Sequence, residues 1–148
     1  MPSHISAIEV MVSDLKKASK WYQEVLGFKV VERVHAYNCV ELALEKDNVV
    51  LDLGEPNPEW GAKAMREGQS MIGRITGVTL QTNNIERIYK HLERKGVCII
   101  EPPRKRPWGE IRMRFADLDG NELTIIELLK KPERKVYKNP RSSRSYGR

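Results

Sequence analysis

At 148 residues, the chain is long enough to form one domain that buries most of its apolar surface without disulfides or metal ions to hold it together. Its net charge of +6 is unevenly distributed, because residues 130–148 carry +7 and residues 1–129 carry −1. No signal-peptide core and no apolar run of about 20 residues is present, so we expect a cytoplasmic protein without a membrane span.

A repeated order of strand and helix patterns runs along residues 6–127. The first copy predicts a strand at 6–12, a helix at 14–26 and strands at 28–34, 38–44 and 49–53. The second copy predicts a strand at 76–82, a helix at 84–95 and strands at 97–100, 110–115 and 122–127. Asp14 and Asn84 are typical helix starts, and Gly27 and Gly96 are typical stops. The order predicts an α+β domain of two β-α-β-β-β modules with the helices on one face.

We place the domain at residues 1–129, with modules at about 4–53 and 75–129 and a linker at 54–74 that is compatible with a short helix at 58–66. Cys39 and Cys98 fall in apolar strand-like runs and are expected to be buried free thiols. Residues 130–148 are rich in Pro and Ser and poor in apolar residues, which predicts a disordered basic tail. Such a tail is either a solvated terminus or a weak contact for a polyanion such as nucleic acid.

Two motifs resemble the opening module and the closing hairpin of one superfamily. The first consists of Asp14-Leu15, Trp21-Tyr22 and Leu26-Gly27-Phe28, and the second of Trp108-Gly109 followed by residues 115–121. They are similar to the vicinal oxygen chelate superfamily, which includes glyoxalase I, extradiol dioxygenases and bleomycin-resistance proteins; Leu118 stands where a proline is common. The resemblance covers residues 4–129 and implies two modules that curl into a cup, with helices outside, and a homodimer.

Enzymes of that superfamily hold a divalent metal with one His, Glu or Gln from each of four strands. The resemblance places these positions at Ala7, Leu51, Gly77 and Thr124. The first three side chains have no donor atom, and a lone neutral hydroxyl is a poor ligand. We therefore expect the usual metal site to be absent and no metal cofactor. Asp52 adjoins Leu51, but a shift of one residue turns a strand side chain to the other face.

Strand alternation predicts which side chains line the cup in place of a metal site. Loops are expected to carry two indole rings to its rim. The candidate ligand-binding residues are Glu9, Met11, Trp60, Gln81, Trp108, Arg112, Arg114 and Glu122, with Thr79 and Leu51 beside them. No nucleophile and base pattern identifies a catalytic residue. Glu9 and Glu122 also admit a structural interpretation, as ion-pair partners of the two arginines.

Three functions remain open at this stage. The missing metal ligands favour binding of a small organic molecule in the cup or at a dimer groove. A second possibility is a lyase, isomerase or dioxygenase whose Mg or Mn is held at displaced positions, for which the strand acids are Glu9, Asp52 and Glu122, with Glu41 joining them. The third is an interaction module that recruits nucleic acid or a protein through the basic tail.

Overall fold

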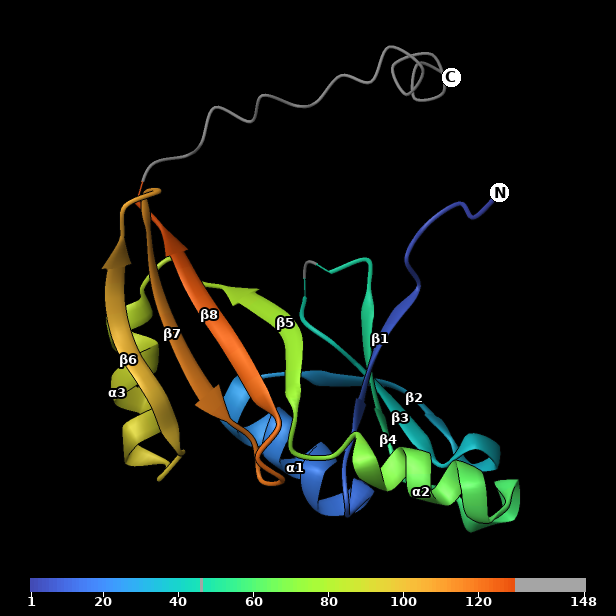
Figure 1. Ribbon diagram of the computed structural model, residues 1–148. Helices are drawn as coiled ribbons and strands as arrows, with labels where there is room; N and C mark the ends of the chain where they lie inside the picture. The colour runs from blue at the N-terminus through green and yellow to red at the C-terminus, as the bar shows by residue number, and fades with distance from the viewer. Residues whose placement is uncertain (46, 130–148) are drawn as a thin grey trace.

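The computed structural model describes residues 1–45 and 47–129 (Figure 1). The predicted basic tail at 130–148 lies outside the described residues, and so does the function assigned to it. In chain order the elements are β1 (Ala7–Met11), α1 (Leu15–Leu26), β2 (Lys29–Val34), the 3₁₀ turn η1 (His35–Tyr37), β3 (Cys39–Ala43), β4 (Val50–Gly54), the 3₁₀ turn η2 (Pro58–Trp60), α2 (Ala62–Ser70), β5 (Ile75–Gln81), α3 (Ile85–Arg94), β6 (Ile99–Arg106), β7 (Glu110–Ala116) and β8 (Glu122–Leu128).

The strands form two four-stranded mixed sheets with the same internal order. The first sheet runs β1-β4-β3-β2 and the second β5-β8-β7-β6, and in each the first two strands are parallel while the others are antiparallel. Helix α1 packs on β2, β3 and β4, and α3 packs on β6 and β8. The predicted α+β fold of two β-α-β-β-β modules is therefore confirmed. We call β1–β4 with α1 the first module and β5–β8 with α3 the second.

Local sequence accounts for where the two packing helices begin and end. The Asp14 side chain accepts a hydrogen bond from the backbone N–H of Lys17, and Asn84 does the same for Arg87, so both predicted N-caps are present. Gly27 ends α1 with φ of +77°, a left-handed conformation that favours glycine. Among the described residues, no helix is long and apolar enough to cross a membrane.

Two details differ from the sequence-based expectations. Strand β6 does not stop before the proline pair but continues through Pro102 and Pro103 to Arg106. Proline has no backbone N–H to donate to a neighbouring strand. The loss costs little in β6, because β6 is an edge strand and its pairing with β7 shifts register on both sides of Glu101. Both cysteines are free as expected, but Cys98 is exposed and Cys39 is only half-buried.

A buried hydrogen-bond network ties the two modules together, and we call it the inter-module clasp. Its centre is Asn121, which is 1% exposed in the turn between β7 and β8. The Asn121 Nδ2 donates to the Met11 carbonyl (2.9 Å) and to Asp117 Oδ2 (2.9 Å), while its Oδ1 accepts from the Gly73 N–H (2.8 Å). The hydroxyl of fully buried Tyr22 in α1 donates to the same Asp117 oxygen at 2.7 Å. One side chain thus joins β1, the segment before β5 and the closing hairpin.

Replacing Asn121 with Ala is expected to lower the free energy of unfolding by about 2 to 4 kcal/mol, because buried polar groups on three segments lose their partner. Urea denaturation measures the effect. The control is Asn83→Ala, at an exposed position, which is expected to change stability by no more than about 0.5 kcal/mol. Equal stability of the Asn121 variant and the native chain would contradict the role assigned to the clasp.

Candidate ligand-binding groove

Four acidic side chains lie in a row across the first sheet, one on each strand. The backbone register pairs Glu9 of β1 with Asp52 of β4, Asp52 with Glu41 of β3, and Glu41 with Glu32 of β2. Residues that are partners in register point to the same face of a sheet, so all four carboxylates project from one surface. We call these four residues the carboxylate row.

Within the part of the chain that the structure describes, the row lacks ion-pair partners. Among the described residues, no Lys or Arg nitrogen lies within 4.0 Å of a carboxylate oxygen of Glu9, Asp52, Glu41 or Glu32. One oxygen of Asp52, Oδ1, is buried and has no hydrogen-bond partner. Like charges directly opposite one another in a sheet are destabilising, and a buried carboxylate oxygen without a donor costs additional free energy. The row is thus a feature that the fold does not need.

Burial and mutual repulsion act together on the row. Burial, followed by repulsion from Glu9, raises the pKa of Asp52. Burial, followed by repulsion from Asp52 and then Glu32, raises the pKa of Glu41. Burial and the same neighbouring acids raise the pKa of Cys39, which keeps that side chain a thiol rather than a thiolate nucleophile. The groups in this site are therefore arranged to attract a positive charge.

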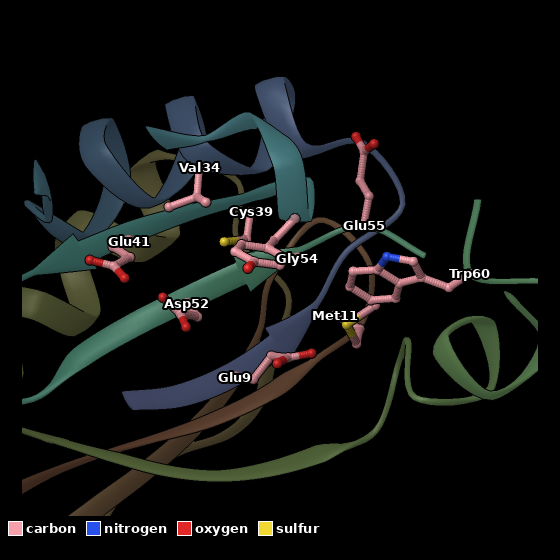
Figure 2. A pocket seen from close by; sticks show the side chains of 10 residues that line it. Glu9, Met11, Val34, Cys39, Glu41, Asp52, Gly54, Glu55 and Trp60 are labelled. Carbon is pink, nitrogen blue, oxygen red and sulfur yellow. The ribbon is translucent and has the colours of Figure 1, made fainter. Parts of the chain in front are cut away.

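A cavity of about 390 Å³ lies over three members of the row (Figure 2). Figure 2 shows Glu41, Asp52 and Glu9 on neighbouring strands, with the indole ring of Trp60 at the Met11 end of the cavity. The full lining consists of Glu9, Met11, Val34, Tyr37, Cys39, Glu41, Asp52, Gly54, Glu55 and Trp60. Two of these are aromatic residues that stay largely exposed, at 63% for Tyr37 and 54% for Trp60. The site thus combines anionic groups with free ring faces.

The cavity continues on both sides of β1. A hollow of about 470 Å³ lies between β1 and α2, and another of about 460 Å³ lies between β1 and β5, where Arg74 is one of the lining residues. All three hollows share Glu9 and Met11. Helix α2 has no buried residue and approaches the sheet closely at Gly68, where an added Cβ would lie 3.2 Å from Met11 Cε. We call the joined hollows the groove, and α2 borders it beside β1 (Figure 1).

The second sheet has a different electrostatic character, because its charges are paired. Arg114 forms ion pairs with Glu122 and, at 3.1 Å, with Glu101, and Arg112 pairs with Glu110 at 3.0 Å. These contacts match the structural interpretation for Glu122. They do not extend to Glu9, which has no arginine partner among the described residues.

The structure brings three of the eight candidate binding residues into the groove: Glu9, Met11 and Trp60. The other five lie elsewhere. The ion pairs of the second sheet include Arg112, Arg114 and Glu122. Gln81 lines a separate cavity between the modules, and Trp108 is 67% exposed beside Arg106 in the turn after β6. The prediction that Leu51 lines the cup is wrong, because Leu51 is 5% exposed and belongs to the core. Its neighbour Asp52 therefore faces the groove.

Sequence reasoning missed part of the groove. Tyr37 and Cys39 were not among the candidate residues, and Asp52 and Glu41 entered only as alternative metal ligands. The alternation of Cys39, Glu41 and Ala43 with buried Val40 and Leu42 carried the signal, because it places the acid on the face opposite the core. Tyr37 lies in the η1 turn, and no strand periodicity predicts its orientation.

At the four positions where the resemblance places metal ligands, the side chains of this chain supply a single oxygen. Leu51 is buried in the core, and Ala7 and Gly77 offer no side-chain donor, so Thr124 supplies the one oxygen. In residues 1–45 and 47–129, no group of three or more His, Cys, Asp or Glu is placed to hold a metal ion. The acids of the row are spaced by the strand separation rather than gathered around one point.

Replacing Asp52 with Asn is expected to stabilise the protein at pH 7. A carboxyl group whose pKa is raised on folding destabilises the native state as the pH rises, because the unfolded chain releases that proton first. The gain is about 0.5 to 1 kcal/mol, the cost of a like-charged cross-strand pair, and it disappears below about pH 3, where the carboxyl is protonated in both states. Thermal unfolding at both pH values measures it, with Glu127→Gln as a control that removes a charge outside the row. A gain that persists at low pH would show that repulsion is not its cause.

Comparisons with known proteins agree with this fold and differ in what they say of function. A crystal structure described as a member of the glyoxalase/bleomycin resistance protein/dioxygenase superfamily from Sphaerobacter thermophilus DSM 20745 is 30% identical, with a TM-score of 0.72 over 85% of this chain and 98% of that chain. TnmS3, described as an antibiotic binding protein from Streptomyces sp. CB03234, is 25% identical, with a TM-score of 0.67 over 86% and 97%. Lactoylglutathione lyase from Agrobacterium tumefaciens, at 20% identity and a TM-score of 0.66 over 86% and 95%, shares the fold.

A search of curated proteins finds no match to this chain. The sequence pattern of one family, however, matches residues 4–125, which is most of the chain and includes both motifs that carried the resemblance. The paired modules and the solved relatives agree with that match. The chain therefore belongs to the glyoxalase/bleomycin resistance protein/dioxygenase superfamily.

Proposed function

We propose that this protein binds a small organic molecule that carries a positive charge and a planar ring, and that the binding site is the groove on the first sheet. The observation that carries the proposal is the uncompensated carboxylate row beside two exposed aromatic rings. A cavity of about 390 Å³ is within the range of small-molecule sites.

Each part of the groove supplies a different interaction. Glu9, Asp52 and Glu41 attract a cation, and its arrival relieves the repulsion among them, so the attraction grows with the number of acids it contacts. The carboxylate of Asp52 lines the cavity and offers a charge-assisted hydrogen bond to an ammonium or amidinium group. The rings of Trp60 and Tyr37 offer faces for stacking or for a cation–π contact.

The relatives support binding over one particular reaction. TnmS3 is described as an antibiotic binding protein, and its chain is almost fully covered by the comparison. Of the four positions where the resemblance places metal ligands, Ala7 and Gly77 have no side-chain donor and Leu51 faces the core, which favours binding over metal-assisted chemistry. Binding and sequestration of an organic molecule use the groove as it stands.

Titration with acridine orange, a planar organic cation, tests the proposal. The native chain is expected to bind the dye with quenching of Trp60 fluorescence, and the double variant Glu41→Gln/Asp52→Asn is expected to weaken binding about tenfold or more, since two charge contacts are lost. Trp60→Leu is expected to weaken binding about three- to tenfold and to remove the quenching. Added salt weakens binding to the native chain, because part of the groove is exposed.

Two controls accompany the titration. Glu127→Gln removes one negative charge outside the row and is expected to leave the dissociation constant unchanged. Fluorescein, a planar anion of similar size, is expected not to bind. Undiminished dye affinity in the double variant, or equal affinity for the two dyes, would overturn the proposal.

We further propose that two chains associate along the free edges of β1 and β5. Both strands are at the edge of their sheets. Exposed apolar side chains lie on them, Ile8 at 42% and Ile75 at 74%, and near them, Ile5 at 70% before β1 and Met71 at 54% at the end of α2. Exposed apolar surface beside an unpaired strand edge favours an interface.

Sedimentation velocity is expected to give the mass of a dimer for the native chain. Ile75→Asp is expected to shift it towards the monomer, because a charge then has to be buried at the contact. Ile100→Asp, on the edge strand β6, is the matched control and is expected to leave the mass unchanged. A native chain that remains monomeric at every concentration would contradict this arrangement.

A further inference from the structure

We infer that the seam between the two modules is a second binding site, for a neutral apolar molecule, and that it is independent of the groove. A cavity of about 440 Å³ lies there. Its aliphatic wall is shared by the modules, with Val25, Leu26 and Leu44 from the first and Leu80, Ile88 and Ile125 from the second.

The chemistry of this cavity differs from that of the groove. No Lys or Arg of the described residues lines it, and its acidic residue, Glu24, has a 60% exposed side chain directed to a pair with Lys20 at 3.9 Å. A charged ligand would therefore lose its hydration without gaining a partner. A neutral apolar body fits the aliphatic wall, and Gln81 and His91 are the polar groups beside it.

The wall retains apolar surface that an occupant would bury. Val25 and Ile125 are buried, but Leu26, Leu44, Leu80 and Ile88 are only half-buried although they pack against the core. Covering such surface contributes roughly 25 cal/mol for each Å² removed from water. This gain favours a bound apolar molecule.

One polar contact joins the two packing helices at the wall of the cavity. The ring of His91 in α3 donates from Nε2 to the carbonyl oxygen of Val25 in α1, at 2.9 Å. Helix α1 ends next to this contact, at Gly27, whose N–H bonds the Gln23 carbonyl at 3.1 Å. This contact ties together the two helices that border the cavity. An occupant would contact both modules and stabilise their association by mass action.

Cyclohexanol, a neutral ring small enough for this volume, is the probe. Titration followed by methyl NMR is expected to shift the Ile88, Ile125 and Leu80 methyl signals in a saturable manner and to raise the melting temperature. Ile88→Trp is expected to abolish both effects by filling the cavity, while Ile100→Trp, on the exposed edge strand β6, leaves them unchanged. Leu44→Phe fills the cavity from the other module and serves if Ile88→Trp does not fold.

The groove variant Glu41→Gln/Asp52→Asn separates this inference from the proposed function. It is expected to bind cyclohexanol as the native chain does, whether or not its affinity for acridine orange changes. Absence of saturable methyl shifts in the native chain would overturn the inference. So would equal shifts in the filled variants. Seam methyl signals that move with protein concentration alone would also overturn it, since a second copy would then cover the cavity.

Discussion

A buried hydrogen-bond network with one amide at its centre joins the two modules. The side chain of Asn121 makes three hydrogen bonds, and each goes to a different segment: the Met11 carbonyl on β1, the Gly73 N–H before β5, and Asp117 within its own turn. Because Asp117 also accepts from Tyr22 of α1, the hairpin that closes the second module is bound to the helix and the edge strand of the first. A polar network of this kind is strong only when every member is satisfied, so the relative position of the modules is narrowly defined.

With the modules positioned in this way, two sheets of the same topology carry opposite electrostatic designs. On the second sheet, arginines and glutamates alternate across the strands and neutralise one another, as in Arg114 between Glu101 and Glu122. On the first sheet the corresponding surface has Glu9, Asp52 and Glu41 with no cation in register. The two sheets share one topology, but charges are paired on the second sheet and like charges face one another on the first. Binding of a positively charged ligand would therefore lower the electrostatic energy of the first sheet only.

Much of the fold could be predicted from local patterns, because these patterns have local causes. Asp14 and Asn84 cap their helices through their own side chains, and strand alternation placed Glu9 and Met11 on the open face correctly. The prediction failed where neighbours outside the segment decide. The face to which Leu51 points depends on the pairing of β4 with β1 and β3. Strand β6 passes Pro102 because no other strand of the described residues pairs with its outer edge. No periodicity within one strand can report that Asp52 has acidic neighbours on both sides.

The hollows along β1 have a consequence for selectivity. Since all three share Glu9 and Met11, guests of different length would keep the same attachment point and differ only in how far they extend beneath α2 or towards Arg74. Recognition of charge then belongs to the sheet, which is stiff, whereas discrimination by size belongs to a helix that has no buried residue. Sequence changes in α2 could retune the range of accepted guests while the anchor stays as it is.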